Sequence, residues 1–566
     1  MAFGERIGLS DESAFGKIRL RRPRYFARNL SGGWAAYYTK SEAGRVVSKV
    51  EELNDIAERI STLSRNAQPS PEQREAFVAA EALAYSLLAT AQWHQDDLAG
   101  AELSLDRALW LRPSGGLMIR RAVLLPRVLP SREGILASRE NVRARLTALA
   151  DAPAVPADVA NEVAWTLFLL AYHGEHDNLS LHRLFHKVCG RADPKLSWAA
   201  PHCGRPRRAG RPRVGFISWH FCEHTISRLF TGLVQAFDSD AFDVSVFSFQ
   251  GQENALANLS WRGKRRVSLV PELIAAQRAI AAAELDFLIY LDLGMDYLTL
   301  FLAHARLARR QGVLWGHPDT TGLDSIDFFF SPDCMEPADG ESHYGERLIR
   351  LPGPTVVYPR PAAAQSLVSR RSLGLPEVGV LYLCPQTPFK FHPDFDPALV
   401  SILQAVPTSH LVFVAGGEPD AMARVKTRLV QPCPKLADRI HILPPLTHSE
   451  FVALFEVCDV VLDPFHYSGG NTSLEAFVSG CPIVTWPGKF MRARHTAGFY
   501  RLMGVTDAVA RDHDHYIKLA IHFGTDARSR AELRGRIRAA SSIVYDSVVG
   551  VRAMENFIKE EVGSWG

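Results

Sequence analysis

The residues between 463 and 488 (DPFHYSGGNTSLEAFVSGCPIVTWPG) have the types and spacing of a phosphate-binding loop. An apolar, strand-like segment leads into two glycines and three small polar residues at the predicted start of a helix: Gly469, Gly470, Asn471, Thr472 and Ser473. At a helix start, unpaired backbone N–H groups and the positive end of the helix dipole attract anions. Glu475, about one turn into the helix, can reach a sugar diol. The pattern suits a nucleotide diphosphate, although ordinary helix caps and turns use the same residue types.

A second candidate, Lys390, follows the first strand predicted in the second half of the chain (CPQTPFKFHPDFDP, 384–397). A lysine at the carboxyl end of a strand, here near Gln386, carries a compact charge that can contact a diphosphate. A solvated surface lysine is the alternative. In the same segment Asp394 and Asp396 form a D-x-D pattern, which some sugar transferases use to hold a metal. Because both aspartates precede a helical segment, we interpret them as helix caps and predict no metal site.

Two loops in the first half of the chain also follow predicted strands. One contains His220 and His224 (SWHFCEHTISRLF), and a histidine there can act as a general base because its ordinary pKa lies near 6.5. A structural role is the alternative, and a metal-binding histidine pair has no clear third ligand. The other loop (LWGHPDTTGLDSIDFFFSPD, 314–333) contributes small and hydroxyl-bearing residues: Gly316, Pro318, Thr320, Thr321 and Gly322. Loops at strand ends commonly line a binding cleft, and we expect both to do so.

These loops require a framework of parallel strands with helices between them. From residue 213 onward, short β-rich runs alternate with helical ones (VGFIS, FDVSVFSF, FLIYLDLG and QGVLWGHP), pause near Pro352 and restart with GVLYLCPQ. Such alternation is typical of parallel sheets covered by helices. We predict an α/β fold with two Rossmann-like lobes, 213–360 and 361–545, whose strand ends face a common cleft. The amphipathic segment 546–566 is predicted to form a helix that packs back on the first lobe.

Residues 1–200 are predicted to form an all-α region, because apolar residues recur there at three- and four-residue spacing. Within them, the unit 82–115 places small, large and helix-ending residues as a tetratricopeptide (TPR) repeat does: Tyr85, Leu88, Ala89, Ala101, Leu105, Ala108 and Pro113. One repeat cannot bury its own face, so neighbouring helices must complete it. An ordinary helical bundle is the alternative. Residues 201–212 are proline-rich and basic, and we interpret them as a linker.

The bulk composition excludes several classes of protein. The chain of 566 residues is 47% hydrophobic and carries a net charge of +3, which is too small to predict binding to nucleic acid or a membrane surface. It contains no apolar run of roughly 18 residues, so no membrane span is predicted. The eight cysteines form no C-x-x-C pair, and the first residues lack the apolar core of a secretory signal. We therefore expect a cytoplasmic protein.

Five motifs, in this order, resemble glycosyltransferase family 41, the group of the protein O-linked N-acetylglucosamine transferases and the SPINDLY-type proteins. They are RVGFISWHFCEHTISRL, GVLWGHPDTTGLDSIDFFFSPD, HYGERLIRLPG, CPQTPFKFHPDFDP and GGNTSLEAFVSGCPIVTWPG. The resemblance covers about residues 205–560, with weaker similarity over 82–150. It implies a GT-B fold of two facing lobes behind TPR-like helices. It also implies inverting sugar transfer from a nucleotide sugar without a metal or other cofactor.

By this resemblance, residues of the predicted loops acquire roles in binding a nucleotide sugar. Lys390, with Gln386 beside it, matches the diphosphate-contacting lysine, and Glu475 matches the acidic ribose ligand. Phe451 falls at the base-stacking position, and His224 matches a histidine discussed as an active-site group. The phosphate-binding segment is matched by Gly470, Asn471, Thr472 and Ser473. The loop on the acceptor and sugar side is matched by Gly316, His317, Pro318, Thr320 and Thr321.

The function implied by the resemblance is transfer of a sugar, with GlcNAc from a UDP-sugar as the first expectation, to Ser or Thr hydroxyls of proteins. The protein acceptors would dock on the helical region. Alternatives within this class are a GDP-fucose or other hexose donor and an Asn acceptor. A catalytically inactive interaction protein would keep the helices but transfer nothing, and a nucleotide-sugar epimerase would not need a protein-docking region. Nothing in the sequence indicates an oligomeric state.

Overall fold

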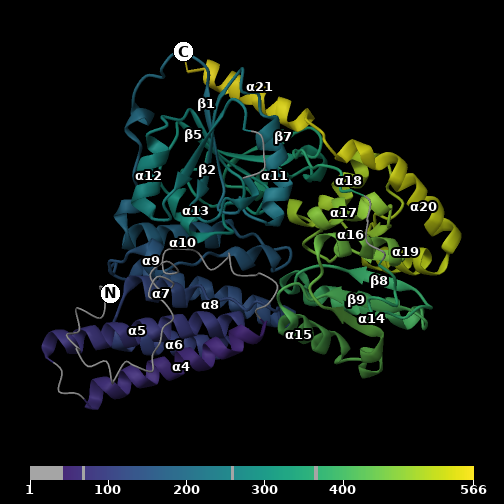
Figure 1. The fold of residues 1–566 in the computed structure, drawn as a ribbon, viewed down its shortest axis with the longest axis horizontal. Coiled ribbons are helices and arrows are strands. Elements are labelled where there is room, and N and C mark those ends of the chain that lie inside the picture. The colour runs from purple at the N-terminus through teal and green to yellow at the C-terminus, as the bar shows by residue number, and fades with distance from the viewer. Residues whose placement is uncertain (1–42, 67–69, 257–260, 363–367, 566) are drawn as a thin grey trace.

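In the computed structural model, which describes residues 43–66, 70–256, 261–362 and 368–565, the chain folds into three parts. Figure 1 shows the N-terminal helices at the lower left, a first α/β lobe above them and a second α/β lobe to the right. The prediction of two α/β lobes behind a helical region is therefore confirmed. The part of the helical prediction that concerns residues 1–42 lies outside the described residues.

The N-terminal part is built from helices with short connections: α4 (Ala43–Asn66), α5 (Pro71–His94), α6 (Leu98–Leu111), α7 (Gly115–Ala122), α8 (Arg132–Asp151), α9 (Val159–Glu162) and α10 (Leu179–Ala192). Ser70 and Gln73 form a capping box that begins α5, and Asp97 caps α6. A short turn joins α5 to α6, so the two helices form a hairpin over the predicted unit 82–115. Ala101 is fully buried where the two helices meet, because a small side chain allows their close approach.

The first lobe has a seven-stranded parallel sheet in the order β3-β2-β1-β4-β5-β6-β7. Its strands are β1 (Arg213–Ile217), β2 (Asp243–Phe249), β3 (Lys264–Leu269), β4 (Phe287–Tyr290), β5 (Arg310–Leu314), β6 (Phe328–Pro332) and β7 (Arg347–Leu351). The intervening helices include α11 (Thr225–Ala236), α12 (Leu273–Ala281) and α13 (Tyr297–Leu302). The sequence pattern did not predict β3, because this edge strand (KRRVSL) is charged and mostly exposed. It also did not predict β6 and β7.

The second lobe has a five-stranded parallel sheet in the order β10-β9-β8-β11-β12. Its strands are β8 (Leu381–Cys384), β9 (His410–Val414), β10 (Ile440–Leu443), β11 (Val460–Leu462) and β12 (Ile483–Val484). Its helices are α14 (Asp396–Ala405), α15 (Pro419–Val430), α16 (His448–Val457), α17 (Asn471–Ser479), α18 (His495–Met503), α19 (His513–Thr525) and α20 (Ala527–Ala540). In each sheet the strand order reverses at the lobe's first strand, β1 or β8. Ligands of open α/β sheets bind beyond the strand ends at such a reversal.

The last helix, α21 (Val549–Gly563), crosses from the second lobe back to the first (Figure 1). The Phe557 ring lies against the rings of Phe328 and Phe330 of β6, at centroid distances of 5.1 and 5.6 Å. Glu555 accepts a hydrogen bond from the backbone N–H of Asp238, 2.7 Å long. Apolar and polar contacts thus both hold α21 on the first lobe.

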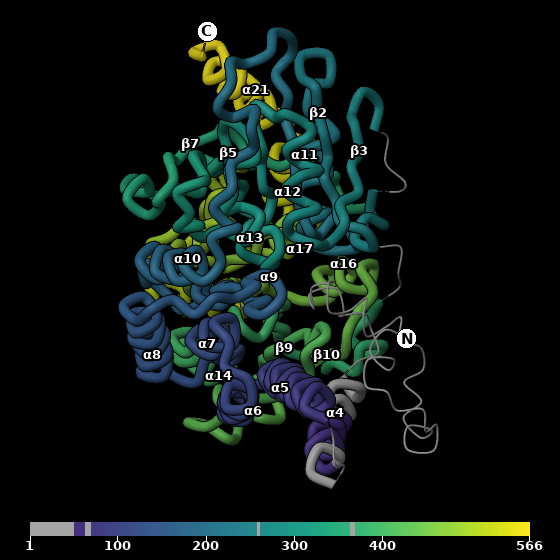
Figure 2. Tube along the Cα trace, turned by 90° about the vertical axis from the view of Figure 1, so that its left-hand side faces the viewer, coloured from purple at the N-terminus to yellow at the C-terminus, as the bar shows by residue number. Residues whose placement is uncertain are grey.

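The helical part also touches both lobes. Figure 2 shows α9 and α10 between α13 of the first lobe and the remaining N-terminal helices. On the other side, Arg127 forms a 2.7 Å ion pair with Glu418, next to α15 of the second lobe. A buried ion pair of 3.2 Å joins Asp319 of the first lobe to Arg492 of the second, and Asn178 of the helical part donates to the same carboxylate. The three parts therefore form one packed body.

Two further features of the structure concern the cysteines and membrane-spanning helices. All eight cysteines lie among the described residues, and none forms a disulfide. Within the described ranges, no helix combines the length and the apolarity needed to cross a bilayer.

Candidate active site

The glycine-rich loop before α17 is held open by one buried carboxylate. Asp463, at the end of β11, accepts hydrogen bonds from the backbone N–H of Gly469 and the hydroxyl of Ser468, 2.8 and 2.7 Å long. A Cβ on Gly469 would lie 2.5 Å from Oγ1 of Thr472 and 2.7 Å from Oγ of Ser473, which is too close for any real side chain. The bare backbone therefore lets the hydroxyls of the first turn of α17 crowd against the loop.

The structure brings three of the predicted donor-site residues into one hydrogen-bonded row. Nζ of Lys390 donates to the side-chain oxygen of Gln386, and Nε2 of Gln386 donates to Oγ1 of Thr472; both bonds are 2.8 Å long. The ammonium group also lies 4.7 Å from the ring centroid of Tyr467. Burial lowers the pKa of Lys390 to about 8, with the nearby Asp463 acting in the opposite direction. The lysine is therefore mostly charged at neutral pH and faces the start of α17.

Glu475 lies at the boundary between the lobes and has partners that the sequence did not predict. Nε2 of His448, the first residue of α16, lies 2.8 Å from its Oε1. Arg228 of α11 and the hydroxyl of Tyr358 donate to the same oxygen at 3.4 and 3.3 Å. Phe451 lies on α16 one turn after His448, with its ring packed edge-on against a neighbouring phenylalanine. Acidic, basic and aromatic side chains thus gather at the lobe boundary, where a ribose and a base are predicted to lie.

The two histidines of the first lobe have different environments. His224 caps α11: its Nδ1 accepts from the backbone N–H of Ile226 (3.2 Å), and burial, then His220, lowers its pKa well below the usual value. The ring of His220 is stacked on that of His224, with centroids 4.3 Å apart. Nδ1 of His220 lies 2.5 Å from the buried carboxylate of Asp292, which also accepts from Ser218. Asp292 follows β4, and the sequence reasoning missed it because the two loops are far apart in the chain.

The loop after β5 is anchored by its small residues and hydroxyls. The backbone N–H of Gly316 donates to the carbonyl of Leu291 (3.1 Å), and a Cβ there would lie 2.3 Å from that oxygen. Pro318 is buried beside it. The hydroxyls of Thr320 and Thr321 both donate to the carboxylate of Glu346. These two predicted acceptor-side residues therefore hold the loop in place, and Glu346 is the partner that the sequence did not indicate.

Three buried side chains of the loops around the cleft carry ring nitrogens without a hydrogen-bond partner among the described residues: Trp315, His317 and His495. Burial lowers the pKa of His317 to about 4 and that of His495 to about 3, so both rings are neutral at pH 7. The rings of Trp315 and His495 lie 5.2 Å apart, and the charge of Lys390 is the second cause of the lowered pKa of His495. Buried polar groups in proteins are nearly always paired, so these nitrogens are suited to contact the hydroxyls of a bound sugar.

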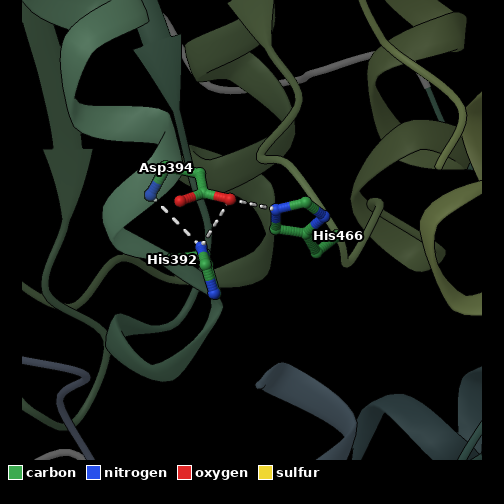
Figure 3. Close-up of side chains that lie close together, drawn as sticks. All are labelled: His392, Asp394 and His466. Atoms are coloured by element: carbon green, nitrogen blue, oxygen red, sulfur yellow. Dashed lines mark hydrogen bonds and ion pairs between the residues drawn. The ribbon is translucent and has the colours of Figure 1, made fainter. Parts of the chain in front are cut away.

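The D-x-D pattern does not point at this site. Asp394 lies beside His392 and His466, and these side chains form a group spaced so that it could hold a metal ion (Figure 3). Each member already has a protein partner: His466 lies 2.9 Å from Asp394, whose backbone N–H donates to Nδ1 of His392. Asp396 faces Arg428, with two hydrogen bonds of 2.7 and 2.9 Å. The prediction that the two aspartates cap a helix is wrong, because their carboxylates form ion pairs instead.

The site as a whole lies between the lobes. Nδ2 of Asn471 in α17 donates to the backbone carbonyl of Thr225 in α11 (3.1 Å), next to His224. The contact between Arg228 and Glu475 crosses the same boundary. The predicted phosphate loop and the predicted histidine loop therefore face each other. This arrangement brings a candidate anion site and a candidate base to opposite sides of one boundary.

Comparison with known proteins relates this cleft to one family of enzymes. Residues 360–549 match the family model described as "Glycosyl transferase family 41". The chain is 27% identical over 245 residues to a protein of Solanum lycopersicum named "Probable UDP-N-acetylglucosamine--peptide N-acetylglucosaminyltransferase SPINDLY", covering 41% of this chain and 25% of that protein. It is 25% identical over 245 residues to "UDP-glucose:protein N-beta-glucosyltransferase" of Actinobacillus pleuropneumoniae, covering 43% and 39%. The chain thus spans less than half of the length of these curated relatives.

A solved structure agrees over nearly the whole chain. A mutant of the Thermobaculum terrenum O-GlcNAc transferase superimposes with a TM-score of 0.66 at 21% identity, covering 91% of this chain and 98% of that one. At this identity the match concerns the fold, which is the predicted two-lobe α/β arrangement behind helices. The family model over residues 360–549 and the curated relatives support the assignment of this region to glycosyl transferase family 41.

Proposed function

We propose that this chain is an inverting glycosyltransferase that moves a sugar from a UDP-sugar to a protein. The observation that carries the proposal is the row Lys390–Gln386–Thr472, which ends at the first turn of α17 and faces the histidines of the first lobe. A cation and a helix start that converge on one point, inside an interlobe cleft, fit a diphosphate. The match of residues 360–549 to the family model supports the same reaction class.

In the proposed reaction, an acceptor oxygen attacks the anomeric carbon while the bond from that carbon to the diphosphate oxygen breaks. Both bonding electrons leave with the diphosphate, so negative charge grows on it. The ammonium group of Lys390 and the N–H groups at the start of α17 stabilise that charge in place. Such stabilisation by fixed charges and dipoles often contributes more to enzyme catalysis than any other effect. No step of this scheme requires a metal ion or another cofactor.

His220 is a better candidate than His224 for the base that takes the proton from the acceptor group. The Nδ1 of His224 accepts the capping N–H of Ile226, so the neutral ring carries its proton on Nε2 and can only donate there. His220 has the opposite arrangement, because its Nδ1–H points at Asp292 and leaves the lone pair of Nε2 free for a proton. We assign His220 as the base, Asp292 as the residue that positions it, and His224 as a donor to the reacting groups.

The sugar and the linkage are the finer part of the proposal. Relatives named as UDP-N-acetylglucosamine–peptide transferases support GlcNAc transfer to Ser or Thr. The Actinobacillus relative, named as a UDP-glucose:protein N-glucosyltransferase, favours a second candidate, which is glucose transfer to Asn. A GDP-fucose donor is the third. These candidates differ in the nucleotide, in the mass added to the acceptor and in the modified side chain.

The experiment separates donor binding from transfer. Thermal unfolding is followed with UDP and with GDP, and a ligand that binds only the folded state raises the Tm. We expect UDP to raise it, and we expect Thr472→Val to reduce that effect. Purified protein is then incubated with UDP-GlcNAc, UDP-glucose or GDP-fucose and a host lysate, and labelled acceptors are identified by intact mass. If neither nucleotide raises the Tm and no donor labels any protein, the proposal is wrong and an inactive scaffold is favoured.

A further inference from the structure

A cavity in the described part of the chain lies away from the donor site, between the helical part and the first lobe. It has a volume of about 530 Å³. One wall is a face of α5 that includes Leu83 and Ser86, and a second wall comes from Ser114 and from Leu117 of α7. Segment 156–169 and the start of α13 close the remaining sides. The cavity therefore lies where the N-terminal helices meet the catalytic body.

A buried guanidinium group projects into this cavity without a counter-ion. Arg120 of α7 is 7% exposed, donates to the hydroxyl of Ser86 (3.0 Å) and to that of Thr90, and lies 5.1 Å from the ring centroid of Trp165. Its Nε has no hydrogen-bond partner, and no carboxylate of a described residue lies within 4.0 Å. Burial lowers the pKa of Arg120 to about 10, so the group stays charged at neutral pH.

An unpaired buried cation is unfavourable, because two hydroxyls replace only part of its hydration. Two acids also line the cavity, but each has other partners. Glu162 accepts from the hydroxyl of Ser114, and Asp296 caps α13 by accepting from the backbone N–H of Thr299. The other basic side chains at the cavity are Arg112 and His94. An external carboxylate is therefore the missing partner of Arg120.

The cavity also has a physical connection to the candidate active site. Phe168, one of its lining residues, stacks on the ring of His317 at a centroid distance of 5.0 Å. It also lies 5.7 Å from the ring of Phe389, the neighbour of Lys390 in the chain. A chain bound along the cavity would thus lead past Phe168 to the loop on the acceptor side of the cleft.

We propose that this cavity binds an extended segment of the acceptor protein, and that a side-chain carboxylate of that segment pairs with Arg120. The inference rests on the proposed function and adds the class of acceptor, namely segments with an Asp or Glu near the modified residue. A planar guanidinium group already fixed by two hydroxyls and an indole is suited to bidentate recognition of a carboxylate. The apolar walls accommodate the neighbouring side chains of the segment.

The test uses two pools of short fluorescein-labelled peptides with a central Ser or Thr, measured by fluorescence anisotropy against the full chain with UDP present. One pool carries Asp and Glu at the flanking positions, and the matched pool carries Asn and Gln. We expect wild-type protein to bind the acidic pool at least about tenfold more tightly, since breaking a buried charged pair is costly. Arg120→Met should remove this preference, Arg120→Lys should retain part of it, and Arg528→Met on the exposed face of α20 should change nothing.

A second variant does not depend on the buried arginine. Leu83 is 39% exposed at the edge of the cavity, so Leu83→Glu should fold normally and repel the acidic pool, again by about tenfold. The UDP-induced rise in Tm is recorded for every variant and should stay as in the wild type. This thermal shift reports on the donor site independently of peptide binding. Equal binding of both pools, an unchanged preference in Arg120→Met and Leu83→Glu, or displacement of the peptides by single-stranded RNA would each overturn the proposal.

Discussion

Replacing Lys390 with Met should abolish most catalysis and yet leave the free protein as stable as before, or more so. Removing one donor from a site that stabilises developing negative charge typically lowers kcat by about 10²–10³-fold. The stability effect follows from the lowered pKa. Moving this pKa from 10.5 to about 8 means that burying the charged form costs at most about 3 kcal/mol at neutral pH. Loss of the bond to Gln386 offsets about 1–3 kcal/mol of that.

The lowered pKa of Lys390 also predicts how the free energy of unfolding changes with pH. Between pH 8 and 10.5 the unfolded chain holds a proton on this lysine that the folded chain has released. Stability from this group therefore rises with pH in that window and is lowest below pH 8. The variant should lack this rise. Free energies of unfolding from urea titrations at pH 7 and pH 9.5, for wild type and Lys390→Met, measure the difference directly.

Lys518→Met is the matched control, because Lys518 is an exposed lysine on α19. It should change neither transfer nor the pH dependence of unfolding. Steady-state transfer of labelled sugar gives kcat, and UDP-induced thermal shifts give donor binding. If Lys390→Met kept the wild-type kcat, the lysine would have no role in the leaving-group step. If it unfolded at neutral pH, the argument from the cost of burying the charge would be wrong.

Three further predictions concern the rest of the cleft. Asp292→Asn should lower kcat about 10²–10⁴-fold, because the asparagine cannot hold His220 in the tautomer with a free Nε2; an unchanged kcat would contradict this. Gly469→Ala should cost about 1–3 kcal/mol and weaken UDP binding, as the new Cβ has no room, whereas Gly535→Ala, with nothing within 4 Å, should be harmless by both measures. Burial alone would raise the pKa of Asp319, but its partners hold it well below the usual range, so its stabilisation is present at neutral pH and fades as pH falls below about 4. Asp319→Asn should cost about 3–5 kcal/mol in urea unfolding at pH 7 and flatten this acid loss; equal slopes for both proteins would refute it.

Much of the fold was predictable from local patterns. The strands that were predicted, such as β1 and β4, are buried on both faces and read as continuous apolar runs. The missed edge strand β3 carries charged side chains, since an edge position does not require burial. The capping box of Ser70 and Gln73, which the structure shows at the start of α5, involves residues only three apart and is local in the same sense.

The site was predictable only where its chemistry is local in the chain. The loop that ends in Thr472 and the strand-end position of Lys390 both follow from short motifs, and the structure places them together. The reading of Asp394 and Asp396 as caps failed because their partners, His466 and Arg428, lie on distant segments. The pairing of His220 with Asp292 was missed for the same reason.

By itself, the sequence determined the alternation of strands and helices, the position of the glycine-rich loop before α17 and the strand-end position of Lys390, because these depend on hydrophobic period and turn chemistry within short stretches. Only the tertiary structure decided which charged groups are neutralised and which are not. Glu475 is shared by three partners from separate elements, whereas Arg120 is buried with none of opposite charge. Ion pairs form only between groups that lie a few ångströms apart. The fold brings such groups together from residues that are tens to hundreds of positions apart in the chain.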